Sequence, residues 1–560
     1  MDLSYKKNNN KILFDSLEKK ELLDLSDSQN YIPLYKNFFK LNESNYNLIN
    51  LNNTLSLKEI ISKESDNKFV GKVVTDKDIE RNKNIFFKLS PLLDPIKYVT
   101  GKYDILDDNL LNLPNFSNPE KCHANVIDPN NIGYVDGFFT YLTSQLLHKH
   151  GFIHGIDFYG SFLAIKNDYM VNIADDMEYL RDSKFFHKNK GKLYEFTKDQ
   201  DFSMLDYDSR SFRPAIVVNE EITNDISLSD ISTIANLEIF APFKDLKDKS
   251  DTPTLLYEGN LKTQSDKSSS CSSRSSNTDI EDNGENADDD DDEDKESCDM
   301  GSCSTASEDQ LLIKIPKFPI QVIALEKCDK TLDYLLMNEN LEGKELGSAI
   351  IQILMILITY QKAFSLTHND LHTNNIMYIE TEKQFLYYKY NDKYYKIPTY
   401  GKIFKIIDYG RAIYKFRGNV ICSNSFHPKG DAATQYNFEP YFDESKPRLE
   451  PNFSFDLCRL GCSMFDFIVE DINQIDEITS PLEKIIINWC LDDKGRNVLY
   501  KNNGDERYPD FKLYKMIART VHNHTPSKVL EESYFQIFTT SKKKINKSQK
   551  IFNIDNISSF

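Results

Sequence analysis

The sequence lacks the closely spaced cysteine pairs that are typical of zinc sites and of small disulfide-rich domains. Its nine cysteines include no C-x-x-C pair, and three of them fall in one low-complexity segment. This spacing excludes the common cysteine zinc sites, and it favours a reducing compartment. Cys458 and Cys462 are four residues apart on an expected helix, where we predict two buried thiols rather than a disulfide.

Features that would indicate a membrane protein are also missing. Residues 1–10 are polar and contain no apolar stretch of the kind found in secretory signals. The most apolar run, residues 349–360, is shorter than the roughly 20 residues that a membrane-spanning helix needs. We therefore expect a buried helix in this run, no membrane partner and a cytoplasmic location.

Negative charge exceeds positive charge, and most of the excess is concentrated in one place. Residues 279–309 hold fifteen Asp and Glu against Lys295 alone, so this segment contributes −14 of the formal net charge of −19. The only dense basic group is in residues 542–550, which we interpret as a solvated tail. Without a basic surface, we expect no nucleic-acid partner.

Two segments of the chain have a composition that is biased toward a few polar residue types. Residues 262–310 are Ser-rich and then acidic, and they cannot bury enough apolar area to offset the entropy of ordering, so we predict a disordered insert. Residues 1–65 are rich in Asn, Lys and Ser, and we expect a loosely packed extension there.

The rest of the chain alternates between strand-like and helix-like patterns. Helices are expected over residues 134–150 and 346–364, and helical periodicity dominates from residue 453 onward. The expected strands are residues 85–89, a strand pair within 152–165, 318–326, a hairpin of 385–390 and 393–397, and 403–407.

Two short motifs point to phosphoryl transfer. Residues 368–375 (HNDLHTNN) follow an apolar helix and match the kinase catalytic-loop pattern H-x-D-L-x-x-x-N at its four fixed positions. Thirty-three residues after Asn375, an apolar strand ends in Asp408-Tyr409-Gly410, which is the D-F-G pattern with Tyr in place of Phe. Phosphoryl transfer needs ligands for Mg²⁺ and a carboxylate that accepts the proton of the attacking hydroxyl, and these motifs supply both.

With these motifs the sequence resembles the protein kinase superfamily, and in detail the divergent serine/threonine kinases of giant DNA viruses. The likeness covers most of residues 80–530 outside the acidic insert, and it is carried by IFFKLSPLLDPIKYVTGKYD, HGIDFYGSF, THNDLHTNNIMY, IPTYGKIFKIIDYGRAIY, GDAATQYN and EPNFSFDLCRLGCSMFDF. A viral relative of this kind would act in the host cell cytoplasm or in the virion.

The resemblance implies an α+β, bilobal protein-kinase-like fold, with a small, mostly β N-lobe that carries long insertions and a larger helical C-lobe. The chain then divides into an N-terminal extension, an N-lobe with the insert at 262–310, a C-lobe and a basic C-terminal tail, over residues 1–65, 66–326, 327–540 and 541–560.

The resemblance also implies a role for single residues. Asp370 would be the catalytic base, Asn375 and Asp408 would hold Mg²⁺, and His372 would donate to the γ-phosphate of ATP. In the nucleotide site, Lys88 would grip the α- and β-phosphates, Gly71 would form a reduced phosphate-covering turn, Glu326 would mark the strand end that binds adenine through backbone groups, and Asp333 would contact the ribose. Asp456 is similar to the buried aspartate that holds the catalytic loop.

Several departures from the kinase pattern keep other functions open. No G-x-G-x-x-G precedes Lys88, and residues 134–150 contain no Glu for the usual ion pair, only Asp136. Asn369 stands where an arginine usually receives an activation-loop phosphate, and the A-P-E landmark is absent.

We therefore weigh three functions. The first is a serine/threonine protein kinase that uses ATP and Mg²⁺ and acts on a protein substrate. The second is a pseudokinase scaffold with the acidic insert as an interaction arm, favoured by the missing glycine loop. The third is a small-molecule kinase of the choline or aminoglycoside type, favoured by His372.

Overall fold

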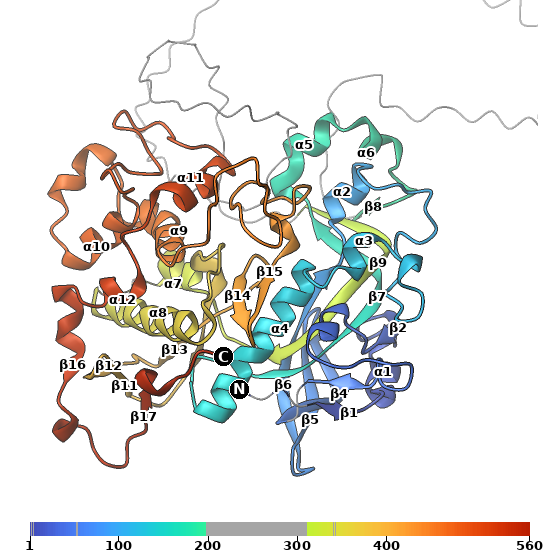
Figure 1. Cartoon of the computed structure of the whole chain (residues 1–560), viewed down its shortest axis with the longest axis horizontal. Helices are drawn as coiled ribbons and strands as arrows, with labels where there is room; N and C mark the ends of the chain where they lie inside the picture. The colour runs from blue at the N-terminus through green and yellow to red at the C-terminus, as the bar shows by residue number, and fades with distance from the viewer. Residues whose placement is uncertain (2, 4, 52–53, 198–310, 340, 342) are drawn as a thin grey trace, which may run out of the picture.

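The computed structural model describes residues 1, 3, 5–51, 54–197, 311–339, 341 and 343–560 (Figure 1). The insert expected over 262–310 lies outside these residues. Of the described residues, 33% are helical and 27% are in strands, a mixture that is consistent with the expected α+β class.

Seven strands form one antiparallel sheet, called the N-terminal sheet below. Its order is β2-β7-β9-β6-β5-β4, with β8 paired to β9. The strands are β2 (Leu25–Gln29), β4 (Leu55–Ser65), β5 (Lys68–Thr75), β6 (Glu80–Pro91), β7 (Phe158–Asn172), β8 (Glu195–Phe196) and β9 (Leu312–Glu326). The predicted strands at 85–89 and 318–326 are therefore confirmed within β6 and β9. The strand pair expected within 152–165 is wrong, because the segment before Phe158 is a loop that bonds to other elements and only β7 is a strand.

One face of the N-terminal sheet is covered by a helix from the first 65 residues. Helix α1 (Lys11–Leu17) buries Leu13, Phe14 and Leu17 in one cluster with Phe69 of β5 and Phe87 of β6. In addition, β2 and β4 belong to the sheet itself. The expectation of a loosely packed extension over 1–65 is therefore wrong for these elements, whose scattered apolar residues are the ones that pack.

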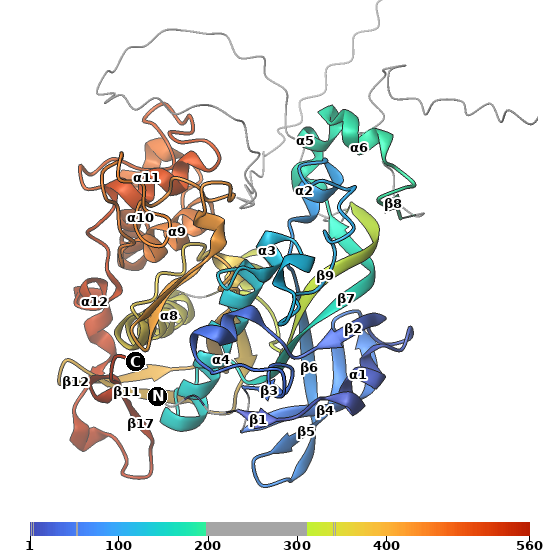
Figure 2. The same cartoon turned by 45° about the vertical axis from the view of Figure 1, so that its right-hand side comes forward.

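The opposite face of the N-terminal sheet packs against helix α4 (Ile132–Gln145), which lies on the other side from α1 in Figure 2. A short π-helical turn over Leu146–His150 continues it, so the helix predicted over 134–150 is confirmed. Asn131 caps its start by accepting a hydrogen bond from Gly133 N–H at 3.0 Å. The shorter elements of this half of the chain are β1 (Lys6–Lys7), β3 (Ile49–Asn50), α2 (Pro95–Val99), α3 (Ala124–Ile127), α5 (Met177–Asp182) and α6 (Lys184–Lys188).

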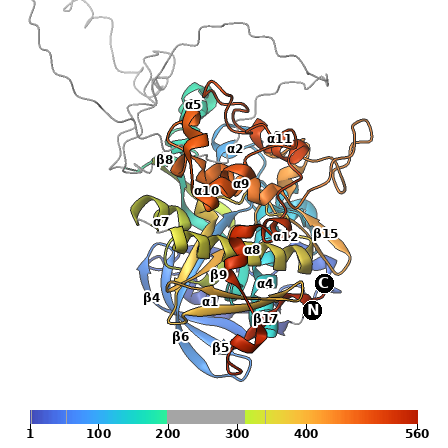
Figure 3. The same ribbon diagram turned by 90° about the vertical axis from the view of Figure 1, so that its left-hand side faces the viewer.

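The second half of the chain is built around helix α8 (Gly343–Phe364). By length and composition α8 is the one described helix that could cross a membrane, but 89% of its most apolar window is buried inside the protein. A core helix passes the same test, and the predicted buried helix is found here. In Figures 1 and 3, α8 lies between a small sheet and the helices α9 (Phe455–Met464), α10 (Pro481–Trp489) and α11 (Lys512–Thr520). Helices α7 (Leu332–Asn338) and α12 (Pro526–Val529) flank it.

Short strands complete this half of the molecule. The predicted hairpin forms as β11 (Phe385–Tyr390) and β12 (Lys393–Pro398), and its turn residues Asn391 and Asp392 both have positive φ, as a tight two-residue turn requires. A second antiparallel pair joins β10 (Ile376–Glu380) to β13 (Lys402–Ile406), and a third joins β14 (Ile413–Phe416) to β15 (Asn419–Cys422).

The C-terminal tail is only partly solvated. The side chains of residues 542–544 are exposed, as expected of a basic tail. Beyond them, however, β17 (Ile551–Asn553) pairs in parallel with β11, and Ile554 is fully buried, while β16 (Thr539–Thr540) pairs with β12. The expectation of a solvated end is wrong for residues 551–557, because alternate apolar residues there add to the core. Cys458 and Cys462 are buried free thiols, as predicted.

Candidate functional site

Two of the predicted metal ligands are brought together by the pairing of β10 with β13. Ile376 stands opposite Ile406, so Asn375 and Asp408 both lie just outside the same end of this strand pair. The backbone N–H of Ile407 donates to Asn375 O at 3.0 Å, which extends the pairing by one residue. The two motifs of the sequence, 33 residues apart, are therefore neighbours in space.

The predicted catalytic loop is held by Asp456 at the start of α9. The Asp456 carboxylate accepts hydrogen bonds from the N–H groups of His368 (2.9 Å) and Asn369 (3.0 Å), as expected of a residue that holds the loop. The His368 ring donates from Nε2 to Ile407 O at 2.9 Å. Because Asp456 is fully buried, burial raises its pKa, and His368 with the two N–H donors opposes this effect. The loop is thus fixed both to α9 and to the residue before Asp408.

Lys88 of β6 reaches this site from the N-terminal sheet. Its ammonium lies 2.7 Å from Asp136 Oδ2 and 2.8 Å from Asp408 Oδ1. Burial would lower the pKa of Lys88, but the carboxylates of Asp136 and Asp408 outweigh burial and raise it. Lys88 therefore stays charged, and it joins the sheet, α4 and the Asp408 motif in one contact.

Asp136 takes the place of the glutamate that residues 134–150 lack. It comes from the first turns of α4 and is almost fully buried. Besides Lys88, it accepts a hydrogen bond from Tyr409 N–H at 2.9 Å. Burial raises the pKa of Asp136, and Lys88 opposes this rise. The ion pair that the sequence left in doubt is therefore present, with a shorter acid.

Asp370 is surrounded by groups that keep its carboxylate charged. Tyr514 of α11 donates its hydroxyl to Asp370 Oδ1 at 2.8 Å, and Arg459 Nε donates to that same hydroxyl oxygen at 2.9 Å. Burial would raise the pKa of Asp370, but the positive charges of Arg411 and Arg459 and the Tyr514 hydrogen bond lower it overall. An ionised carboxylate is the form that a proton acceptor needs.

The residues around Asp370 were not found from the sequence. Tyr514, Arg411 and Arg459 come from three separate places, and none of them belongs to a motif of the catalytic loop. Arg411 directly follows Gly410 and pairs with Asp431 at 2.7 Å. In the sequence, the position of Arg411 next to the Asp408 motif was the one available signal for these residues.

His372 and Asn375 contact each other inside the catalytic loop. Asn375 Nδ2 donates to Asp370 O at 2.9 Å and lies 3.1 Å from His372 Nε2, which accepts in this geometry. Burial lowers the pKa of His372, and the Asp370 charge only partly opposes it, so the ring is neutral near pH 7. The amide of Asn375 thereby directs its nitrogen to the loop, and its carbonyl oxygen is the atom that could bind a metal.

The donor set fits a magnesium ion carried by a nucleotide. Asp408 uses Oδ1 for Lys88 and Gly410 N–H, and Oδ2 makes no hydrogen bond to any described residue. A carboxylate oxygen and an amide oxygen are hard ligands, and Mg²⁺ in such sites takes its remaining ligands from phosphate groups and water. Among the described residues there is no group of three or more His, Cys, Asp or Glu that could hold a metal by itself.

Three other predicted site residues, Gly71, Glu326 and Asp333, make contacts within the protein. Gly71 lies in the middle of β5, paired with Ile60 and Lys83, and not in a turn. A Cβ there would come within 2.5 Å of Ile85 Cδ1, so the glycine is explained by sheet packing. The phosphate-covering role of Gly71 is therefore wrong. The turn between β4 and β5 is formed by residues 66–67, which are Asp and Asn.

Glu326 and Asp333 are engaged in contacts within the protein. Glu326 N–H donates to Asp157 O at 2.8 Å, and its carboxylate lies 2.5 Å from Lys405 Nζ. This N–H is therefore used within the protein, between β9 and the loop before β7, and adenine binding through the other backbone groups of this strand end stays a prediction. Asp333 accepts the Thr373 hydroxyl at 2.6 Å, which places it beside the catalytic loop.

No protein-family model matches this chain, and no curated protein matches it in sequence. The geometry of the site is accordingly the main source for its function.

Proposed function

We propose that this chain is an ATP- and Mg²⁺-dependent phosphotransferase with a bilobal protein-kinase-like fold, and that it acts as a serine/threonine protein kinase. The observation that carries the proposal is the double ion pair of Lys88 with Asp136 and Asp408, at 2.7 and 2.8 Å. Protein kinases use a lysine on the third strand, paired to an acid on a helix, next to a metal-binding aspartate. Lys88 lies on the third strand of the β4-β5-β6 succession.

The arrangement of the remaining residues supports the same chemistry. Asp370, at the start of the loop that also carries Asn375, is the acceptor for the proton of the attacking hydroxyl. As the hydroxyl oxygen forms a bond to the γ-phosphorus, the bond from that phosphorus to the bridging oxygen of ADP breaks, and the proton passes to Asp370. Lys88 binds the phosphates with its charge, and neutral His372 lies next to the transferring group. A magnesium ion held by Asp408 and Asn375 would neutralise charge on the phosphates.

A pseudokinase is the second candidate, and the turn between β4 and β5 favours it. The turn contains no glycine, so its backbone cannot approach phosphates as closely as a glycine-rich loop does. In addition, Glu64 near this turn lies 3.0 Å from Lys327 Nζ, directly after β9, and this contact ties the hairpin down. Both the glycine-free turn and this contact are compatible with a scaffold that binds no nucleotide.

Phosphotransfer from radiolabelled ATP tests the proposal. The wild type should label protein substrates, and Asp370→Asn should reduce labelling by about 10²-fold or more, since a general base contributes that much. A contaminating kinase would be unaffected by the substitution. Label that appears only in a pool of small alcohols would identify a small-molecule kinase, and no label together with no thermal shift on adding ATP and Mg²⁺ would identify a scaffold.

A further inference from the structure

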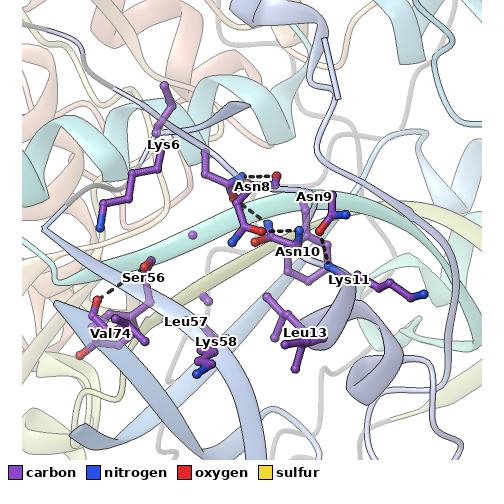
Figure 4. Close-up of a pocket in the computed structure, with 18 of the residues that line it drawn as sticks. Lys6, Asn8, Asn9, Asn10, Lys11, Leu13, Ser56, Leu57, Lys58 and Val74 are labelled. Carbon is purple, nitrogen blue, oxygen red and sulfur yellow. Dashed lines mark hydrogen bonds between the residues drawn. The ribbon is translucent and has the colours of Figure 1, made fainter. Parts of the chain in front are cut away.

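A cavity of about 530 Å³ lies on the face of the N-terminal sheet that carries α1, away from Lys88 and Asp370. One wall is the segment from Lys6 to Leu13, and the other is formed by β4 and β5, with Asn8, Asn9 and Asn10 on one side and Ser56, Leu57 and Val74 on the other (Figure 4). This volume is within the range of small-molecule sites, which is roughly 300–1,000 Å³.

The cavity results from the curling of the sheet. Strands β4 and β7 contact each other although β9, β6 and β5 separate them in the sheet order. The apolar side chains between them are covered by α1, which fills the inside of the curl with Leu13, Phe14 and Leu17. The curl is not filled next to the first turn of α1 and the segment that precedes it. This open end is similar to the mouth of a β-barrel, and such mouths are common ligand sites.

The strand at the back of the cavity is irregular at this point. The pairing of β7 with β9 shifts register between Phe158 and Gly160, and Gly160 has a φ of 146°. A Cβ built on Gly160 would meet nothing within 4 Å. Bulges and strand glycines occur where a ligand or another backbone comes close, and here the space next to the glycine is unfilled.

The lining combines positive charge at the rim with an apolar floor. Lys6, Lys7, Lys11 and Lys58 line the cavity, against only two carboxylates, those of Asp78 and Glu80. Glu80 is already paired with Lys58 at 2.6 Å, whereas Lys6 makes no ion pair with any described residue. The floor is formed by Leu13, Leu57, Phe162 and Ala324, all of them buried.

The asparagine wall is fixed in place by its own hydrogen bonds. Asn10 Nδ2 donates to Asn30 Oδ1 and to Asn50 Oδ1, both at 2.6 Å, and Asn10 N–H donates to Asn8 Oδ1 at 2.9 Å. Asn10 is buried and has a φ of 54°. A wall that is held in this way does not need to rearrange when a ligand binds, and the cost of ordering it is already met.

We propose that this cavity binds a small amphiphilic anion, with its carboxylate or phosphate group at Lys6 and the rim and its short apolar part against Leu13, Leu57 and Phe162. The proposal does not depend on the proposed function, because the cavity and the site of Asp370 share no residue.

Titration calorimetry on the full chain with four ligands that each contain an eight-carbon chain tests this proposal. Octanoate and octyl phosphate should bind about tenfold more tightly than octanol, and octyltrimethylammonium should bind most weakly. A preference for one of the two anions would identify the head group. Equal binding of all four ligands, or no binding of either anion at millimolar concentration, would overturn the proposal.

Two matched pairs of variants place the ligand in the cavity. Lys6→Glu should weaken octanoate binding about tenfold, while Lys19→Glu, an exposed position outside the lining with the same charge change, should leave it unchanged. Val74→Phe should remove binding by filling the space, whereas Val420→Phe, on exposed β15, should not. Melting curves would verify that each variant is folded. Equal effects within either pair would contradict a site in this cavity.

Discussion

The two halves of the candidate site resemble a kinase site in different ways. The half from the helical region, residues 368–375 with Asp408, Tyr409 and Gly410, keeps both the residue types and their spacing. The half from the N-terminal sheet keeps the charges but not the residues: Asp136 replaces a glutamate, and Asp66 and Asn67 stand in a turn where glycines are usual. Under the proposed function, the groups that would touch the reacting atoms are thus closer to the kinase pattern than the groups that would hold the nucleotide.

Loss of the lysine should have the largest effect in the sheet half. Lys88→Met removes the charge for the phosphates and leaves the buried Asp136 carboxylate without its cation, so we expect phosphotransfer to fall about 10²- to 10³-fold. Lys83→Met, an exposed position on the same strand, is the matched control for steady-state kinetics. Equal activity of the two variants would show that Lys88 is not needed for nucleotide binding.

The helix acid should matter through its charge rather than its length. Asp136→Asn should reduce kcat/KM for ATP by about 10- to 100-fold, because Lys88 then pairs with Asp408 alone and competes with the metal. Asp136→Glu keeps the charge, and it should retain activity within about tenfold of the wild type. If Asp136→Glu is as impaired as Asp136→Asn, then the site requires the shape of the acid at this position and not only its charge.

The helical half can be tested with a small change next to the base. Tyr514→Phe removes one of the groups that, with Arg411 and Arg459, lower the pKa of Asp370, so that pKa should rise. Since the base must be ionised, the acid limb of the kcat/KM profile should move to higher pH by the same amount. Tyr500→Phe, which removes a similar hydroxyl bond to Asp466 outside the site, should leave the profile in place. A shift in both variants, or in neither, would contradict a positioning role for Tyr514.

The junction of the two regions should affect stability more than activity. His154, in the loop before β7, donates from Nδ1 to Phe404 O at 2.6 Å and accepts the Tyr388 hydroxyl at Nε2. Burial lowers the pKa of His154 to about 3. The folded form therefore keeps the ring neutral while the unfolded chain takes up a proton below about pH 6.5, so stability falls with decreasing pH.

The expected loss of unfolding free energy from this histidine between pH 7 and pH 5 is about 2 kcal/mol. Denaturant unfolding at the two pH values measures it. His154→Gln should remove this part of the pH dependence, even though the variant is less stable at pH 7. An unchanged pH dependence in the variant would rule out His154 as its source.

The sequence predicted the elements that have a strong local signal. The 385–397 hairpin follows from the turn at Asn391 and Asp392, and the helix over 346–364 follows from its long apolar run. The same reasoning failed for residues 1–65 and 551–557, where it gave more weight to the many polar residues than to the apolar residues scattered among them. Such segments become ordered only because the rest of the core offers a surface, and that information is not local.

The site itself was predictable where neighbouring residues in the chain form it. Residues 368–375 and 408–410 were found by their spacing, and Lys88 by strand alternation. Tyr514 and Arg459 come from helices distant in sequence, and their role depends on how α9 and α11 pack on the loop. Gly71 was misplaced because it is the only glycine before Lys88 in the sequence and was therefore assigned to a phosphate-covering turn, whereas it lies within β5, close to Ile85 Cδ1.

The most direct test of the account is the affinity for ATP with and without Mg²⁺, measured by titration calorimetry for the wild type and for Asp408→Asn. If Asp408 and Asn375 hold the metal beside Lys88, Mg²⁺ should tighten ATP binding to the wild type by about tenfold or more, and the variant should lose this gain. Binding of ATP that ignores Mg²⁺ in the wild type, or a gain that survives in Asp408→Asn, would contradict it.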